Sequence, residues 1–107
     1  MQINKWDVWL AEVNFEDAPD VGKIRPVLVV GHQEIFVLSY TMTGTQRNQD
    51  YKVQNLESAG LSKPTYIRVN KKNKSVSAKY IKQLGVLDPI DIDSFVARLK
   101  DSVKIGT

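Results

Sequence analysis

Hydrophobic residues along most of the chain occur in short segments that turn-forming residues separate. Residues 6–13 alternate between two sides, Trp6, Val8 and Leu10 on one and Trp9 and Ala11 on the other, which is the period of a β-strand. The same reasoning predicts five further strands, at 25–30, 35–40, 51–54, 65–69 and 84–87. Polar and turn-forming residues predict loops at 14–24 and 41–50 and tight connections at 31–34 and 59–64. A short helical turn is expected at 78–83, capped by Ser77. Residues 25–40 therefore read as a hairpin.

Only the last segment has the pattern of a long α-helix. Asp88 is a favourable N-cap, and Pro89 follows it at the first helical position, where a missing N–H costs nothing. An apolar stripe then recurs at three- and four-residue spacing: Ile92, Phe95, Val96, Leu99 and Val103. Gly106 is the expected terminator.

Short strands followed by one terminal helix favour a mainly β protein, a small and partly open barrel with the helix packed on it. The 107 residues suffice for a single domain spanning 1–107, and they contain no cysteine, which excludes disulfides and thiolate metal sites. The apolar runs are too short for a membrane span, and the N-terminus lacks a signal-peptide pattern, so we expect a cytoplasmic protein.

The charge distribution gives a first indication of function. Net charge is +3, and residues 63–82 carry seven basic side chains and no acidic one. Such a stretch can follow a nucleic-acid backbone or can be an ordinary solvated face. Tyr66 and Tyr80 lie within it and can stack on bases or belong to the core.

Several short motifs, in their order and spacing, resemble the MazF/PemK family of toxin ribonucleases. The matching segments are WDVWLA at 6–11, GKIRPVLVV at 22–30, MTG at 42–44, GLSKPTYIR at 60–68 and KQLGVLDPID at 82–91. The sequence departs from the family where Trp6 replaces an initial glycine and where 16–20 are unusually acidic. Thr41, Thr43 and Thr45 alternate, so any of them can be the family's threonine.

The resemblance implies an SH3-like barrel of the MazF/PemK/CcdB type, usually a homodimer, that is held in check by a cognate antitoxin. It implies a type II toxin that cleaves single-stranded RNA at short sequence motifs, without cofactor or metal, through attack of the RNA's own 2′-OH. Two alternatives stay open: a CcdB-like toxin that inhibits gyrase without being an enzyme, and a degenerate member that only binds RNA or antitoxin.

On this reading Arg25 and Thr43 are the candidate catalytic residues. A guanidinium clamps phosphate with two parallel hydrogen bonds and stays charged at working pH, and we expect Arg25 at the mouth of a strand, next to a flexible loop. A threonine hydroxyl at 43 can donate to a phosphate oxygen. The structural alternatives are a solvated strand-end charge and a strand-end β-former. The expected RNA-binding residues are Lys23, Lys63, Arg68, Lys71 and Lys72.

His32 is the only histidine, and we interpret it as a turn residue. It should lie at the opposite end of its strand from Arg25, roughly 20 Å away at about 3.3 Å per residue. The acids at 88, 91 and 93 fit the start of a helix and not a metal site.

Overall fold

The computed structural model describes residues 2–14, 22–47 and 49–105, apart from the side chains of Asn14, Lys71 and residues 102–105. Its elements are β1 (Asp7–Asn14), β2 (Gly22–Gln33), β3 (Phe36–Thr43), β4 (Tyr51–Lys52), β5 (Tyr66–Val76), the 3-10 turn η1 (Ser77–Lys79), β6 (Tyr80–Val86) and α1 (Pro89–Ile105). The strands form one antiparallel sheet in the order β4-β5-β3-β2-β1-β6. This confirms a mainly β fold with a C-terminal helix.

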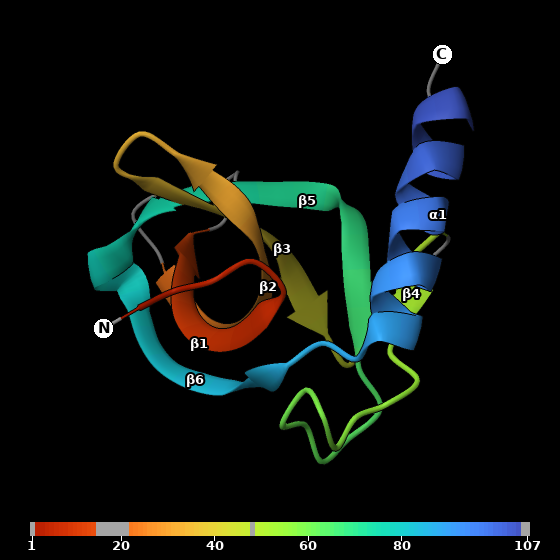
Figure 1. Cartoon of the computed structure of the whole chain (residues 1–107), viewed down its shortest axis with the longest axis horizontal. Helices are drawn as coiled ribbons and strands as arrows, with labels where there is room; N and C mark the ends of the chain where they lie inside the picture. The colour runs from red at the N-terminus through yellow and green to blue at the C-terminus, as the bar shows by residue number, and fades with distance from the viewer. Residues whose placement is uncertain (1, 15–21, 48, 106–107) are drawn as a thin grey trace.

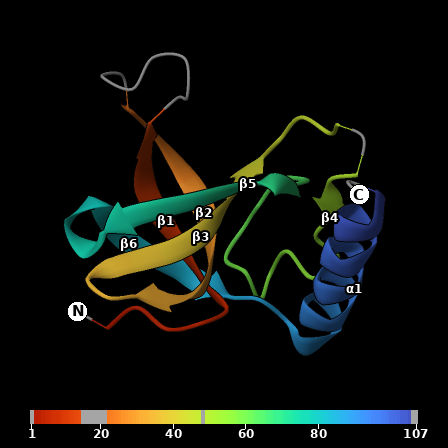
Figure 2. The ribbon, with the colours of Figure 1, turned by 90° about the horizontal axis from the view of Figure 1, so that it is seen from above.

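The sheet curls strongly, as Figure 1 shows, with α1 on one side of it (Figure 2). It does not close, because β4 and β6 are edge strands that do not pair with each other. The word barrel therefore describes the curvature of the sheet and not a closed ring of hydrogen bonds.

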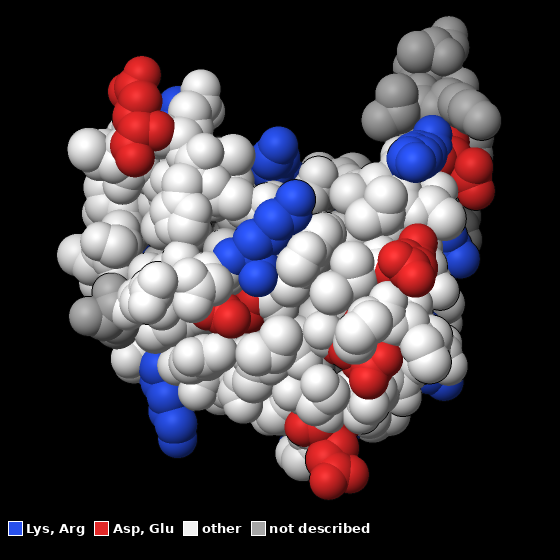
Figure 3. All heavy atoms as spheres, in the orientation of Figure 1, with Lys and Arg blue, Asp and Glu red and all other residues white. Residues whose placement is uncertain are grey.

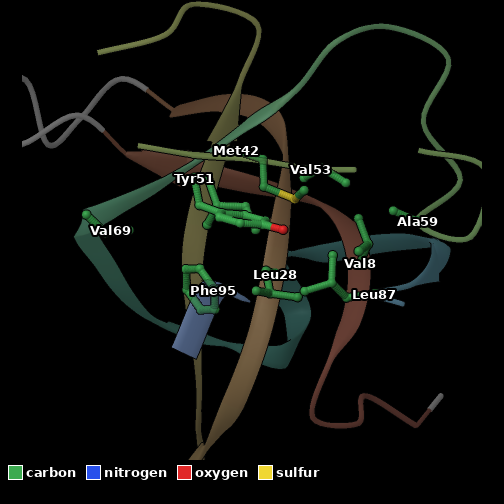
Figure 4. Packing of buried hydrophobic residues seen from close by; sticks show 10 residues of the cluster. Val8, Leu28, Met42, Tyr51, Val53, Ala59, Val69, Leu87 and Phe95 are labelled. Atoms are coloured by element: carbon green, nitrogen blue, oxygen red, sulfur yellow. The ribbon is translucent and has the colours of Figure 1, made fainter. Parts of the chain in front are cut away.

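Two hydrophobic clusters lie on opposite faces of this sheet. The outer cluster packs under α1 and includes Val8, Leu28, Met42, Tyr51 and Phe95, whose side chains converge in Figure 4. The inner cluster lies within the curl of the sheet and contains Ile3, Trp9, Ala11, Val27, Val29, Val37 and Tyr80. Because both faces of β1 and β2 are covered, these strands carry nearly continuous apolar runs.

The start of α1 is tied to the segment after β4. Asp88 caps the helix by accepting the backbone N–H of Ile90 at 2.9 Å, as predicted. Asp91 is fully buried and accepts three hydrogen bonds, from the Tyr51 hydroxyl (2.6 Å) and from the backbone N–H groups of Gln54 (2.7 Å) and Asn55 (2.9 Å). Asp91 therefore joins the first turn of the helix to the chain around β4.

Several strands are longer than the sequence predicts. β2 begins at Gly22 because it pairs with β1 as far as Asn14, so the loop expected at 14–24 is wrong for 14 and for 22–24, while 15–21 lie outside the described residues. β2 also continues to Gln33, which moves the hairpin turn from 31–34 to residues 34–35. β5 extends to Val76 by pairing with β3, although residues 70–76 are mostly polar.

The helical turn predicted at 78–83 is also wrong. The structure has a three-residue 3-10 turn, η1, whose N-cap is Val76 and which has no side-chain cap from Ser77. β6 then begins at Tyr80, since pairing with β1 extends the strand. The helix terminator expected at Gly106 lies outside the described residues. In the described part of the chain, no helix is both long and apolar enough to span a membrane.

Candidate nucleic-acid interface

Arg25 and Thr43 lie on the same face of the sheet, on the neighbouring strands β2 and β3. Val27 and Thr41 are the last registered pair of these strands, and Arg25 and Thr43 each stand two residues beyond that pair. Side chains two apart in a strand share a face, so both belong to the face of Val27, the inner one. A guanidinium and a hydroxyl are thereby placed at one end of the inner cluster.

Arg25 lies inside a paired strand and not at the mouth of a strand, so strand pairing holds its backbone in place. It lies three residues inside β2, pairs with Ala11 of β1, and is half-buried. The expected position next to a flexible loop is therefore wrong, because the β1–β2 ladder continues past Arg25 to Gly22. The guanidinium projects from a rigid element, which suits a group that must stabilise charge without reorganising.

The structure distinguishes the three alternating threonines. Thr41 faces Val27, and its Oγ1 accepts a 2.7 Å hydrogen bond from Nδ2 of Asn73. Thr43 ends β3, and its Oγ1 accepts a hydrogen bond from the backbone N–H of Thr45 at 3.2 Å. Because the oxygen is the acceptor in this bond, the hydroxyl can still donate a hydrogen bond to another group. Thr45 is exposed and lies beyond the strand. Of the three threonines, Thr43 is the one that lies on the inner face at the end of β3.

A hollow of about 180 Å³ opens between the end of β1 and the chain from β5 to η1. Its lining consists of Glu12, Val13, Asn73, Lys74, Ser75 and Lys79. Glu12 and Lys79 form an ion pair at 3.4 Å in which both side chains are about two-fifths exposed. In this lining Val13 pairs with Lys23 and Asn73 donates to Thr41, whereas the β5 partner of Thr43 is Tyr66, which lies outside the lining.

Among the expected RNA-binding residues, Lys23 shares the face of Arg25, two positions away on β2. Arg68 also faces inward, because it alternates with Ile67 and Val69 of the outer cluster. Lys72 faces Tyr40, whose ring packs on Phe95 of α1, so it belongs to the outer face. Lys63 is exposed in the segment between β4 and β5, and the Lys71 side chain lies outside the described residues. Figure 3 shows basic and acidic side chains interspersed with uncharged surface on the face in view.

Arg68 has a structural partner that the sequence did not predict. Its Nη1 donates to Oδ2 of Asp50 at 3.2 Å, and the two side chains are only 12% and 2% exposed. The same carboxylate oxygen accepts the backbone N–H of Arg47 at 3.0 Å, while Nη1 of Arg98 donates to the Asp50 carbonyl at 3.1 Å. This network fastens the chain that follows Thr43 to β5 and α1.

The remaining candidates lie away from this face or inside the core. His32 is exposed near the far end of β2, seven residues from Arg25, as expected, but it pairs with Val37 within the strand, so its interpretation as a turn residue is wrong. Tyr80 is 4% exposed in the inner cluster, and burial raises the pKa of its hydroxyl, an effect that Ser39 only partly offsets. Within the described ranges, no three His, Asp or Glu residues gather closely enough to hold a metal ion.

Comparison of the structure with solved proteins identifies the fold. The Mycobacterium tuberculosis toxin MazF-mt6 matches with a TM-score of 0.73 and 17% identity, over 92% of this chain and 96% of that one. An endoribonuclease in complex with its cognate antitoxin, from Mycobacterial species, matches with a TM-score of 0.75 and 14% identity over 96% of both chains. A further Mycobacterial endoribonuclease gives 0.69 and 14%, over 94% of this chain and 89% of that one.

No protein-family model and no curated protein match the sequence. The structural matches nevertheless cover nearly the whole length of both partners, including the curled sheet and the terminal helix. The chain therefore has the fold of the MazF toxins, which is the fold that its motifs predicted.

Proposed function

We propose that this protein is an endoribonuclease toxin of a type II toxin–antitoxin system, one that cleaves single-stranded RNA without a metal ion. The observation that carries the proposal is the placement of Arg25 and Thr43 on one face of the sheet, each two residues beyond the end of the β2–β3 pairing, within a MazF-type fold. Three proteins of this fold are described as a MazF toxin or as endoribonucleases, one of them in complex with its antitoxin.

RNA supplies its own nucleophile, which is why such a site can be small. The ribose 2′-oxygen attacks the adjacent phosphorus and loses its proton, the bond from phosphorus to the 5′-oxygen breaks, and that oxygen takes up a proton. The products are a 2′,3′-cyclic phosphate, which opens to a 3′-phosphate, and a 5′-hydroxyl. Between these states the phosphorane carries extra negative charge, which fixed donors stabilise.

Arg25 and Thr43 supply such donors. The Arg25 guanidinium makes two parallel hydrogen bonds to non-bridging phosphate oxygens, and its charge does not depend on pH in the working range. The Thr43 hydroxyl donates a hydrogen bond to the same phosphate. Lys23, on the same face of β2, attracts the neighbouring backbone phosphate.

The other expected RNA contacts have less support. The Arg68 guanidinium is already engaged by a buried carboxylate, and Lys72 faces the side of the sheet that carries α1. We therefore assign phosphate positioning to Lys23 and treat Lys63 and Lys71 as contributors to the general positive potential. The antitoxin complex of a structural neighbour supports inhibition by a cognate antitoxin protein. We further propose that the protein acts in the cytoplasm as a homodimer.

Incubation with a defined single-stranded RNA in EDTA, followed by mapping of the ends, tests the proposal. We expect cuts at a short motif that leave 5′-hydroxyl ends, and no cut where the attacking ribose is 2′-deoxy. Thr43→Val should reduce the rate more than Thr41→Val, because Thr43 lies at the end of β3 while Thr41 is held inside the sheet by Asn73. RNA left intact while DNA-gyrase supercoiling is inhibited would replace this function by that of a gyrase poison.

A further inference from the structure

The orientation of the Thr43 hydroxyl depends on the chain that follows β3. Thr43 is the last residue of the strand, and residues 44–47 are exposed outside the sheet. The backbone N–H of Thr45 donates to Oγ1 of Thr43 at 3.2 Å. A threonine side chain occupies one of three staggered χ1 positions, and this hydrogen bond favours the one that brings Oγ1 to Thr45. The hydroxyl is therefore oriented only as long as Thr45 stays in place.

Asp50 fixes the far end of this exposed segment. Its Oδ2 accepts the backbone N–H of Arg47 at 3.0 Å, and its own N–H donates to the Arg47 carbonyl oxygen at 3.1 Å. Gln49, the residue before Asp50, has a φ of 74°, a strained conformation that persists only where the surrounding contacts impose it. Residues 44–46 therefore connect two fixed points, the end of β3 and Arg47, and so short a connection has few conformations.

Two arginines fasten Asp50 to the rest of the protein. Nη1 of Arg68 on β5 donates to its Oδ2 at 3.2 Å, and Nη1 of Arg98 on α1 donates to its carbonyl oxygen at 3.1 Å. The Asp50 side chain is only 2% exposed, so its charge-assisted hydrogen bonds are stronger and better defined than those of a surface carboxylate. Arg68 lies two positions from Tyr66, the strand partner of Thr43, so the anchor stands next to the strand pair that carries the hydroxyl.

We propose that Asp50 is a positioning residue for RNA cleavage, one that keeps the Thr43 hydroxyl oriented toward the phosphate. The proposal rests on the ribonuclease function above and adds a residue that acts on the reaction without touching the RNA. Arg68 and Arg98 hold Asp50, and Asp50 holds the turn that keeps the N–H of Thr45 on Thr43. A donor oriented in advance contributes more to the transition state than one that must first be ordered. Loosening this path should therefore slow the chemical step and leave RNA binding nearly unchanged.

Single-turnover cleavage of a defined RNA by Asp50→Asn, Thr43→Val and the double variant tests the proposal. Asp50→Asn, which lacks the charge and one acceptor oxygen, should slow cleavage by about tenfold, while the Kd of the same RNA with a 2′-deoxy attacking ribose changes by less than about twofold. In the Thr43→Val protein the same substitution should change the rate by less than about twofold, because the hydroxyl that Asp50 positions is gone. Asp7→Asn is the matched control and should cut at the wild-type rate, since this buried carboxylate bonds to residues near the start of β1.

The Thr43 side chain also gives a readout that needs no cleavage. The three-bond NMR couplings of its methyl carbon report χ1, and we expect one rotamer in the wild type and in Asp7→Asn. Asp50→Asn should show averaging over several rotamers. Thr45→Pro should do the same, because proline has no N–H to donate and the change leaves Asp50 intact. Thr45→Pro carries the same kinetic prediction as Asp50→Asn, so the test stands even where loss of the buried carboxylate impairs folding.

The outcomes separate the positioning role from the nuclease. Equal slowing by Asp50→Asn with and without the Thr43 hydroxyl would show a general structural effect and overturn the positioning role, while the ribonuclease function stands. A single Thr43 rotamer in both Asp50→Asn and Thr45→Pro, or averaging in the wild type itself, would overturn it too. A wild type that cuts no RNA overturns the ribonuclease function, and the positioning role with it.

Discussion

Gly60 and Gly85 pack backbone against backbone. A Cβ placed on Gly85 would lie 2.8 Å from the amide nitrogen of Gly60, and one placed on Gly60 would lie 1.9 Å from the carbonyl oxygen of Leu84. Two hydrogen bonds between Ser58 and Val86, one through the backbone and one through the Ser58 hydroxyl, hold the segments together at 2.9 and 2.7 Å. The contact fixes the segment between β4 and β5 against the edge strand β6.

We expect Gly85→Ala to lower the free energy of unfolding by about 2–4 kcal/mol, since its Cβ would lie 2.4 Å from the Ser58 carbonyl oxygen and backbone cannot move aside easily. Gly31→Ala is the matched control, because nothing lies within 4 Å of its Cβ, and its stability should equal or exceed that of the wild type. Denaturant unfolding measures both. Equal stability of the two variants would contradict the close packing.

The turn between β2 and β3 contains a strained residue. Gln33 pairs with Phe36, so Glu34 and Ile35 form a two-residue connection, and Glu34 has a φ of 56°. Glycine is favoured at the first position of such turns. Glu34→Gly should therefore raise the free energy of unfolding by about 0.5–1 kcal/mol. Glycine relieves the backbone strain of the folded state, and part of this gain is lost because glycine also gives the unfolded chain more conformational freedom. Gln33→Gly, within the strand, should lower it.

The Tyr51 hydroxyl predicts a pH dependence of stability. Burial, followed by the hydrogen bond to Asp91, raises its pKa to about 12 from an ordinary value of 10. Between these values the unfolded chain has lost the proton and the folded chain has kept it, so stability falls as the pH rises from about 10 to 12. Tyr51→Phe should be less stable at pH 8 but should lose less stability over that interval. Identical pH profiles of the two proteins would contradict this role.

The ion pair of Asp50 and Arg68 predicts a structural role for a residue expected to bind RNA. Arg68→Met leaves a buried carboxylate without its cation and should cost about 3 kcal/mol in the absence of RNA. Adding Asp50→Asn should recover part of that loss, which a double-mutant cycle by denaturant unfolding measures. An Arg68→Met protein of unchanged stability would instead indicate that Arg68 is held for a ligand.

Local sequence signals predicted the elements that depend on near neighbours. Asp88 and Pro89 mark the start of α1 correctly because capping involves residues two to four positions apart. The β2–β3 hairpin was predicted for the same reason, although its turn lies further along than expected.

Elements that depend on distant partners were missed. Residues 70–76 form a strand because β3 pairs with them, and their lysine-rich sequence reads equally well as a solvated surface. Asp50 and Arg68 are 18 positions apart, and Asp91 and Tyr51 are 40 apart, so only the folded chain reveals these contacts. Family resemblance indicates Arg25 and Thr43, and the alternation of side chains along β2 and β3 places both on one face of the sheet.

Single-turnover cleavage of a defined RNA by Arg25→Ala tests the central claim most directly, with Arg25→Lys beside it and melting curves as the control for folding. We predict a rate at least about 100-fold below that of the wild type for Arg25→Ala, and only partial recovery for Arg25→Lys, because an ammonium group lacks the planar fork. Folded Arg25→Ala protein that cuts RNA at the wild-type rate would contradict the account.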